Sequence, residues 1–585
     1  MAEAEKDQTD APAPKGRLAR LRAGLGAGAV QTGAVLARWR RAIGAELRAG
    51  LTTIRLKGPG QVQFWLIALV IGIVAGLAAI GFRVSILALQ ELFYGVDDFT
   101  LASHLAELHW GWVVAIPILG GLAVGLILHR FTPDGRAQNL ASVIEGAALR
   151  DGRVQKRVGL ASTLASLITL STGGSSGREG PVVHLGAVIS SWVSNVIHAD
   201  GITARDLMGC AVAAAVSASF NAPIAGALFA LEVVLRHFAV HAFAPIVIAS
   251  VAGTVVSRLQ MGNVTEFILP VNMLGFYEEL PAFTILGLLC GFVAYAMMRA
   301  IFIAEDAGDY VARITRMPKW LRPAVAGALL GGIAISYPHI IGVGYETTEA
   351  ALTGNLLLWE AIVFAITKCI AVAITFAGRM GGGIFSPSLM MGALTGLAFG
   401  AVATTIFPGV SGTETLYALA GMGAVAAAVL GAPISTTLIV FELTGDWQAG
   451  IAVMVTVSLA SALASRLVHR SFFLTQLERS GVHLAGGPQD YLPATISAGR
   501  LMRALGADNG PSESQLSDLV AQGVFVAPND TLEKALPLLD KVGLLPVVRQ
   551  AADGSGPEIL GAVYHVDALK AYARALAETA REEHS

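Results

Sequence analysis

The sequence predicts an all-α polytopic membrane protein, built from two inverted-topology repeats with re-entrant or broken helices and followed by a small α/β cytoplasmic domain. Of the 585 residues, 54% are hydrophobic and 14% are charged, and apolar runs of about 20 residues recur along most of the chain. This apolar part contains two short glycine- and proline-containing motifs, one in each half. After about Arg479, charges, loops and alternating strand patterns replace the apolar runs.

The first 60 residues form a polar, Ala-rich leader without the apolar core of a signal peptide. Residues 15–57 hold ten Lys and Arg and one acid, Glu46. Because basic segments are retained on the cytoplasmic side of a membrane, we expect the leader to be cytoplasmic. Its role is open between a solvated helix and a segment that contacts anionic lipid headgroups.

The apolar part predicts a series of membrane helices. We expect them over 62–94, 111–129, 157–176, 180–197, 205–240, 243–260, 281–303, 320–337, 357–377, 387–406, 413–442 and 450–468. Several of these ranges are too short, or too interrupted by Gly and Pro, to cross a bilayer fully. We therefore expect re-entrant helices that are buried within the protein.

The internal repeat rests on motifs that keep their order and spacing. Gly177–Pro181 is followed five residues later by Gly-Ala, and so is Gly383–Pro387. Further on, an Ala-Pro-Ile stretch precedes Glu232 by the same spacing with which a second one precedes Glu442. Such a repeat predicts two inverted halves, about 61–270 and 280–470, whose broken helices meet near the bilayer midplane.

The two glycine-containing loops each open a long apolar helix. Glycine lets backbone N–H groups turn toward a ligand, and the N-terminus of the following helix adds a partial positive charge. The loops therefore read as two halves of one anion site. By contrast, the formal net charge of −2 gives no indication of nucleic-acid binding, and we expect none.

The C-terminal residues 483–585 predict a β-α-β-β-α order. The expected elements are a strand over 524–530, a helix over 531–542, strands over 544–548 and 559–563, a helix from Asp567, and a preceding helix over 496–505. The Leu-Pro-Val-Val run and the Gly-Ala-Val ahead of Asp567 resemble one CBS domain. Such domains sometimes bind adenine nucleotides. For this single short copy we expect a structural or dimer-contact role instead, and no cofactor elsewhere.

Taken together, Gly177–Pro181, Gly383–Pro387, the stretch Asn221–Gly226 and the CBS-like tail resemble the CLC chloride channel and chloride/proton antiporter family. The resemblance covers about residues 60–575. It implies a transmembrane domain over 61–482 and a homodimer in which each subunit has its own pore for a small inorganic anion. It also implies a multi-pass protein of the lipid bilayer, in a bacterial inner membrane, with both termini cytoplasmic.

Carried over residue by residue, the resemblance makes Glu179 the gating glutamate, whose carboxylate competes with the anion. An intramembrane carboxylate is costly and is normally kept for function. Arg178 would hold the loop and shape its potential. The expected anion-binding residues are Gln138, Asn139, Gly177, Arg178, Gly180, Gly383, Ile384, Phe385 and Phe473, with the Ile384 and Phe385 amides as central ligands.

Three positions depart from the family pattern. The family's central serine falls on Gln138, or on Asn139 if the register slips by one residue, and an amide N–H can still donate to an anion. The family's pore tyrosine corresponds to Phe473. Antiporter members carry an internal proton acceptor directly after the position of Glu232, and here that residue is Val233. Glu232, like Glu442, is expected to be a structural carboxylate at a helix end.

The sequence therefore favours a glutamate-gated anion pathway that is channel-like or weakly proton-coupled, with a chloride/proton antiporter as the alternative. We do not expect an enzyme. The distant alternative is an intramembrane metalloenzyme, because His237 and His241 are spaced i, i+4, but no glutamate lies between them to activate water. His184 is expected to be a buried histidine. Cys210, Cys290 and Cys369 lie singly in apolar runs and predict no metal or redox site.

Overall fold

The computed structural model describes residues 55, 59–96, 100–238, 240–262, 277–482, 484, 492–493, 496–506, 511–550 and 557–584. Most of the predicted leader 1–60 lies outside these residues. The first half of the helical region contains α2 Gln61–Tyr94, α3 Leu101–Leu105, α4 Trp110–Phe131, α5 Leu140–Leu149, α6 Lys156–Ser171, α7 Glu179–Ile197, α8 Gly201–Phe220, α9 Pro223–Phe229, the π-helix Ala230–Leu235 and α10 Val240–Met261.

The second half repeats this succession. Its elements are the short 3₁₀ helix Tyr277–Glu279, α11 Leu280–Ile314, α12 Arg322–Ala334, a second 3₁₀ helix Pro338–Ile340, α13 Tyr345–Leu352, α14 Leu358–Ala377, α15 Phe385–Ile406, α16 Glu414–Leu430, α17 Pro433–Thr444, α18 Trp447–Leu467 and α19 Phe472–Arg479. Equivalent elements have similar lengths in the two halves: α2 has 34 residues and α11 has 35, while α7 has 19 and α15 has 22. The predicted fold class is confirmed.

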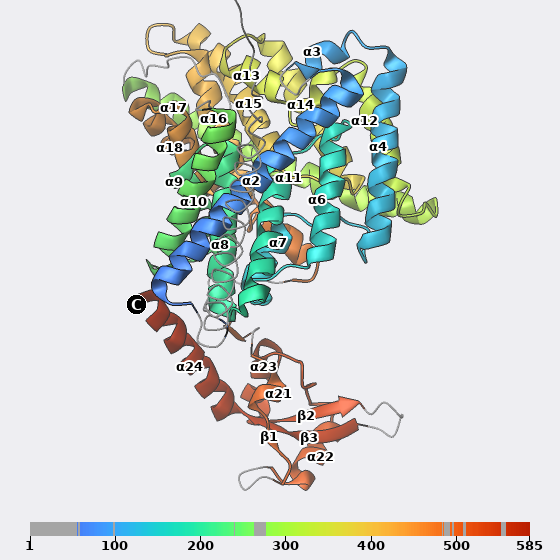
Figure 1. Ribbon diagram of the computed structural model, residues 1–585, viewed down its shortest axis with the longest axis vertical. Coiled ribbons are helices and arrows are strands. Elements are labelled where there is room, and N and C mark those ends of the chain that lie inside the picture. The colour runs from blue at the N-terminus through green and yellow to red at the C-terminus, as the bar shows by residue number, and fades with distance from the viewer. Residues whose placement is uncertain are drawn as a thin grey trace, which may run out of the picture. The chain divides into compact units, whose positions relative to one another are not determined.

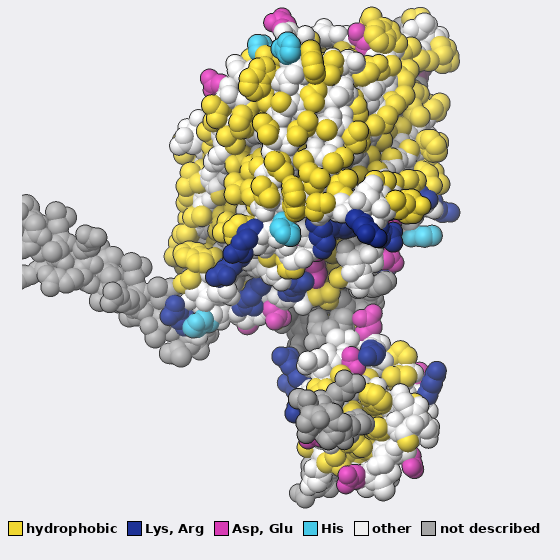
Figure 2. All heavy atoms as spheres, turned by 90° about the vertical axis from the view of Figure 1, so that its right-hand side faces the viewer, with side chains coloured by type: hydrophobic (Ala, Val, Ile, Leu, Met, Phe, Trp, Pro, Cys, Tyr) yellow, Lys and Arg dark blue, Asp and Glu magenta, His cyan; other side chains and the backbone are white. Residues whose placement is uncertain are grey.

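Nine helices in the described part of the chain are long and apolar enough to cross a membrane. Five others, α5, α9 with the π-helix, α12, α16 and α17, are apolar but shorter. These are the broken or re-entrant helices that the Gly and Pro interruptions predict. Figure 2 shows hydrophobic side chains over most of the visible face of the helical region, with Lys and Arg along one border.

Two of the expected spans, 205–240 and 413–442, are wrong as single helices. The first is broken between α8 and α9, where Asn221 has a left-handed φ of 57°. The second is broken at the equivalent place between α16 and α17, where Gly431 has a φ of 70°. In both cases an Ala-Pro pair follows. Proline lacks the N–H that continues a helix and disfavours helical geometry at the residue before it.

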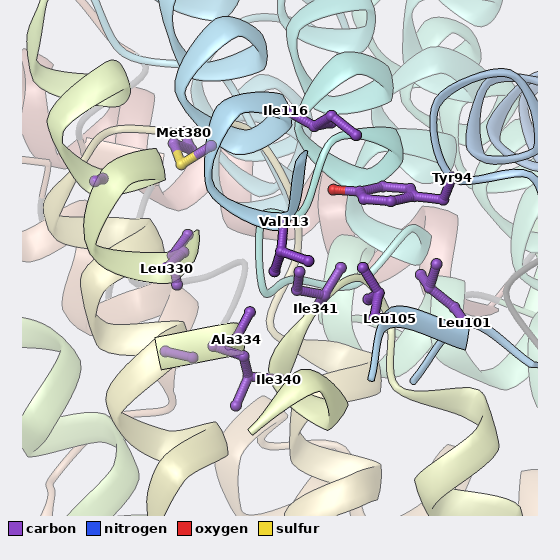
Figure 3. Packing of buried hydrophobic residues seen from close by; sticks show 12 residues of the cluster. Tyr94, Leu101, Leu105, Val113, Ile116, Leu330, Ala334, Ile340, Ile341 and Met380 are labelled. Carbon is purple, nitrogen blue, oxygen red and sulfur yellow. The ribbon is translucent and has the colours of Figure 1, made fainter. Parts of the chain in front are cut away.

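A cluster of buried hydrophobic side chains joins the two halves (Figure 3). Tyr94 at the end of α2 and Val113 and Ile116 of α4 contribute from the first half, and Leu330 and Ala334 of α12 from the second. The loop residue Met380, which precedes α15, packs in the same cluster. The cluster therefore anchors the chain just before one of the two glycine-containing loops.

α4 and α12 pack closely because glycines line their contact (Figure 1). A Cβ on Gly327 of α12 would lie 2.1 Å from the Pro117 carbonyl oxygen of α4, whereas a Cβ on Gly332, in the same helix, would meet nothing within 4 Å.

We expect Gly327→Ala to lower the free energy of unfolding by about 2 kcal/mol or more, because the two backbones must separate. Gly332→Ala should be neutral or stabilising by up to about 1 kcal/mol. Thermal unfolding of both variants in detergent checks this; equal unfolding temperatures would contradict it.

The C-terminal region holds α21 Ala498–Leu501, β1 Arg503–Ala504, α22 Glu513–Ala521, α23 Leu532–Val542, β2 Leu544–Gln550, β3 Pro557–Tyr564 and α24 His565–His584. Its sheet has the order β1-β3-β2, with both pairs antiparallel. The expected helix over 496–505 is wrong, because the chain turns extended at Met502 and pairs with β3. The expected strand over 524–530 is reduced to one parallel bridge, between Val526 and Val547.

Candidate anion site

The two glycine-containing loops meet directly. The Gly177 N–H donates to the Gly383 carbonyl at 2.7 Å, and the Gly383 N–H donates back to the Gly177 carbonyl at 2.8 Å. A Cβ on Gly383 would lie 3.0 Å from the Gly180 nitrogen, so a side chain there would press on the backbone of the opposite loop. The bridge fixes the N-termini of α7 and α15 beside each other, one from each half of the chain.

Glu179 is the first residue of α7, and its side chain is only 3% exposed. Both of its carboxylate oxygens lie 2.6 Å from the Ser386 hydroxyl, which donates from the second residue of α15. The carboxylate is therefore held at the N-terminus of the helix opposite, where the partial charge is positive. Ser386 belongs to the second motif, but sequence reasoning did not single it out.

Arg178 also lies near the carboxylate. Its Nε is 3.9 Å from the Glu179 Oε1, and its guanidinium carbon is 4.8 Å from the centre of the Tyr345 ring. Stacking on an aromatic ring orients a guanidinium while leaving its charge intact. Arg178 thus adds positive potential to the site from a fixed position. The contribution of Tyr345, at the start of α13, was not predicted.

A small cavity lies beside Glu179. It is lined by Asn139, Leu140, Glu179, Gly180, Val183, Val216, Phe229, Phe376, Gly383, Ile384, Phe385, Phe472 and Phe473. Asn139, Arg178 and Ile384 are the residues that precede α5, α7 and α15. Three helix N-termini therefore converge on the cavity, and their partial charges favour an anion.

Of the two residues that could replace a central serine, Asn139 lines the cavity and Gln138 does not. Asn139 caps α5, since its Oδ1 accepts from the Ala141 N–H at 3.0 Å, and its Nδ2 donates to Gln476 at 2.9 Å. The Gln138 N–H donates to the Ser162 hydroxyl at 2.9 Å. Of the two candidates, the structure therefore places only Asn139 at the cavity.

Aromatic rings form much of the cavity wall. The Phe385 ring centre is 4.9 Å from that of Phe220 and 5.9 Å from that of Phe229. Phe473 also lines the cavity, next to Phe472. The edge of an aromatic ring carries partial positive charge, so these rings can face an anion without a hydroxyl donor.

A second cavity, of about 530 Å³, is lined by residues further along α5 and α19. Ile144, one turn after Leu140, lines it together with Leu474. Its charged and titratable lining residues are Glu232, Arg236, His469 and Arg470. Val233 faces this cavity too, from the π-helix. The position expected to lack a proton acceptor therefore lies on a polar cavity next to the anion site.

Glu232 and Glu442 cap helices of the opposite half. The Glu232 carboxylate accepts from the Ile434 N–H at 2.9 Å and from the Ser435 N–H at 2.7 Å, at the start of α17. The Glu442 carboxylate accepts from the Ile224 and Ala225 N–H groups at 3.0 and 2.8 Å, at the start of α9. Each glutamate is thus a helix-end carboxylate, as expected from the sequence, and the contacts are reciprocal.

The histidines do not form the arrangement that a metal site needs. His237 follows the π-helix, while His241 lies in α10 with its Nε2 3.3 Å from an Asp206 oxygen. The i, i+4 spacing therefore does not lie on one helix face, because the chain changes element between the two residues. His184 is fully buried in α7. No group of three metal-ligating side chains occurs among the residues that the structure describes.

A family profile described as voltage gated chloride channel matches residues 120–465. The chain belongs to this CLC family. Its class of function is CLC-family anion transport, and it is a multi-pass integral membrane protein. Relatives include a chloride channel protein ClcB-like of Ralstonia nicotianae, 32% identical over 66% of this chain and 90% of the relative. The voltage-gated ClC-type chloride channel ClcB of Escherichia coli is 30% identical over 70% of this chain and 97% of the relative.

Solved CLC structures share the fold. A slow cyanobacterial Cl⁻/H⁺ antiporter has a TM-score of 0.63 at 22% identity, covering 71% of this chain and 97% of its own. A eukaryotic CLC transporter has a TM-score of 0.62 at 18% identity, covering 88% of this chain and 98% of its own. At these identities the likeness concerns the CLC fold alone.

Proposed function

We propose that the chain moves small inorganic anions, chloride foremost, through a pore in each subunit, with Glu179 as the gate and without tight proton coupling. The observation that carries this proposal is the position of the Glu179 carboxylate. It accepts from Ser386 at the N-terminus of α15 and borders the cavity on which three helix N-termini converge. A carboxylate there competes with a permeant anion for the same positive potential.

The adjoining polar cavity supports a continuous anion route. Arg236 and Arg470 outnumber Glu232 among its charged lining residues, and its lining begins one turn beyond Leu140 on α5, a residue of the anion site. Desolvated anions are attracted into such clefts when cations line low-dielectric walls. An anion would pass from this cavity to the helix N-termini, where Glu179 blocks the way when ionised.

The channel-like reading rests on Val233, because a valine cannot carry a proton at the position where antiporter members have a glutamate. The alternative is a chloride/proton antiporter, which is favoured by the structural likeness to the cyanobacterial Cl⁻/H⁺ antiporter. A fluoride/proton antiporter is another structural neighbour, with a TM-score of 0.58 at 20% identity, so fluoride belongs in any test of the preferred anion.

In reconstituted liposomes, a chloride gradient should drive chloride efflux without sustained uphill proton movement. The measurement pairs a chloride electrode with a pH indicator inside the same liposomes, with and without an imposed proton gradient. Liposomes without protein measure the background leak of chloride and protons. Proton pumping with a fixed ratio to chloride would overturn the uncoupled proposal and establish the antiporter, and no flux of chloride, nitrate or fluoride would overturn the anion pathway itself.

The family resemblance also supports a homodimer of two independent pores, in a bacterial inner membrane with both termini cytoplasmic. A pore built from the two halves of one chain needs no partner residue to be complete. The tail is proposed to be a CBS-like structural module rather than a nucleotide site, since its core is an apolar cluster that includes Val526, Leu539, Val547 and Val563.

A further inference from the structure

A basic cavity lies at the end of α11, away from the anion site. It has a volume of about 350 Å³ and is lined by Asp309, Ala312, Arg313, Met317, Lys319, Arg322 and Arg379. Four of these side chains are cationic and one is anionic, so the lining carries an excess of three positive charges. An anionic group would be attracted to this cavity.

The single lining carboxylate is already shared among arginines. Asp309 accepts from Arg379 at 2.9 Å and from Arg136 at 3.2 Å, and it also pairs with Arg322. Arg313 and Lys319 pair with no carboxylate among the residues that the structure describes. Two cations at the mouth of the cavity are therefore available to a ligand.

An apolar groove lies on α11 and α14, the two helices whose C-terminal ends lead to this cavity. It has a volume of about 630 Å³ and lies between α11, α14 and α15, with Phe292, Ile366 and Ile370 among its exposed lining residues. From Ile370 of α14 to Arg379 beyond its end is about 13 Å at 1.5 Å per residue. The hydrocarbon core of a bilayer is roughly 30 Å thick, so this distance is about the depth of one leaflet, which is what a single acyl chain spans.

A stripe of exposed side chains on one face of α11, which includes Arg299 and Asp306 between its apolar members, runs from the groove toward the cavity. Phe292, Ile303 and Tyr310 are 57%, 59% and 60% exposed. Their spacings of eleven and seven residues return to nearly the same helix face. Tyr310, one turn before Arg313, has the amphipathic side chain that is enriched at the headgroup level of membranes.

We propose that this surface binds one anionic phospholipid, with the headgroup phosphate in the basic cavity and an acyl chain along the stripe and groove. The site is distinct from the anion pathway, and its occupant must be amphipathic because the two parts of the surface differ in polarity. Basic pockets between membrane helices are suited to such headgroups. Lys and Arg along one border of the hydrophobic surface (Figure 2) fit the level at which headgroups lie.

The test uses native mass spectrometry of the full chain, purified from vesicles that contain equal phosphatidylglycerol and phosphatidylcholine. Wild-type protein should retain phosphatidylglycerol in preference to phosphatidylcholine. Lys319→Gln and Arg313→Gln should each lower this retention roughly fivefold, as expected for loss of one cation near a headgroup. Arg316→Gln is the matched control: it removes the same charge from the same segment but does not line the cavity.

A groove-filling variant, Ala365→Phe, separates a lipid from a free phosphate. It should lower phosphatidylglycerol retention while all four cations remain, and millimolar inorganic phosphate should not displace the lipid from wild type. Equal retention in Lys319→Gln, Arg316→Gln and wild type would overturn the site. Retention that survives Ala365→Phe but is lost to inorganic phosphate would mean that the cavity takes a free phosphate, and would overturn the lipid proposal.

Discussion

Glu179→Gln should raise chloride flux at neutral pH roughly tenfold and remove most of its activation by acid. The Glu179 carboxylate contacts Ser386 at the N-terminus of α15 and lines the cavity, and in the proposed mechanism its charge competes there with a permeant anion. Glutamine keeps the shape but loses the charge, so it imitates protonated Glu179; the tenfold change corresponds to about 1.4 kcal/mol. Wild-type flux should rise as the external pH falls. Chloride efflux from liposomes between pH 4.5 and 7.5 measures both effects.

Three further variants separate charge from bulk. Glu179→Ala should also open the space that the side chain fills, so its flux should equal or exceed that of Glu179→Gln. Glu179→Asp keeps the charge with altered geometry and should keep a pH response. Ser386→Ala removes a hydrogen bond to Glu179 but leaves the charge of Glu179 in place. The pH dependence of chloride flux should therefore persist in this variant but be weaker. If Glu179→Gln and Glu179→Ala both left flux and its pH dependence unchanged in folded protein, Glu179 would not be the gate.

Glu232→Ala and Glu442→Ala should each destabilise the helical region by about 2–3 kcal/mol. Each carboxylate accepts two backbone N–H groups at the start of a helix in the other half, and Glu232 also accepts from the Ser435 hydroxyl. Removing it leaves helix-end donors unpaired, and loss of an N-terminal cap typically costs about 0.5–2 kcal/mol, with more for charged acceptors. Thermal unfolding in detergent, followed by size-exclusion recovery, gives the comparison.

Glu145→Ala is the matched control for these caps. Glu145 pairs with Arg150, whose side chain is 44% exposed, so its loss should cost under about 1 kcal/mol. Glu232→Gln and Glu442→Gln should retain part of the stability, since an amide oxygen still accepts hydrogen bonds. Unfolding temperatures of the alanine variants that match Glu145→Ala would show that the reciprocal contacts do not hold the halves together.

Much of the fold was predictable because it follows from local hydropathy and from motifs that occur in both halves of the chain. Apolar runs gave the membrane helices, and motif order gave two related halves. The helix breaks near Asn221 and Gly431 were missed because hydropathy is continuous across them. The Ala-Pro pairs beside them, already noted as part of the repeat, carried the missing signal. In the tail, Arg503 and Ala504 pair with β3 through a contact that no local pattern reveals.

The site was partly predictable for the same reason. The structure brings together Gly177, Glu179, Gly383 and Phe385, which the motifs named. It also brings in Ser386 and Tyr345, whose contacts with Glu179 and Arg178 depend on packing between distant segments. The choice between Gln138 and Asn139 needed the exact start of α5, and helix boundaries are the least certain part of a sequence prediction.

The pairing of Glu179 with Ser386 sets an order of events during synthesis. The two residues are 207 positions apart, so at roughly 5–20 residues per second the ribosome adds Ser386 about 10–40 s after Glu179. In that interval neither the hydroxyl nor the partner loop at Gly383 exists to receive the carboxylate. A bare carboxylate is costly inside a bilayer, so the nascent first half must carry Glu179 protonated, paired with Arg178 or in contact with water. The anion site is then completed only when the second half has been made, and its completion is part of what joins the two halves.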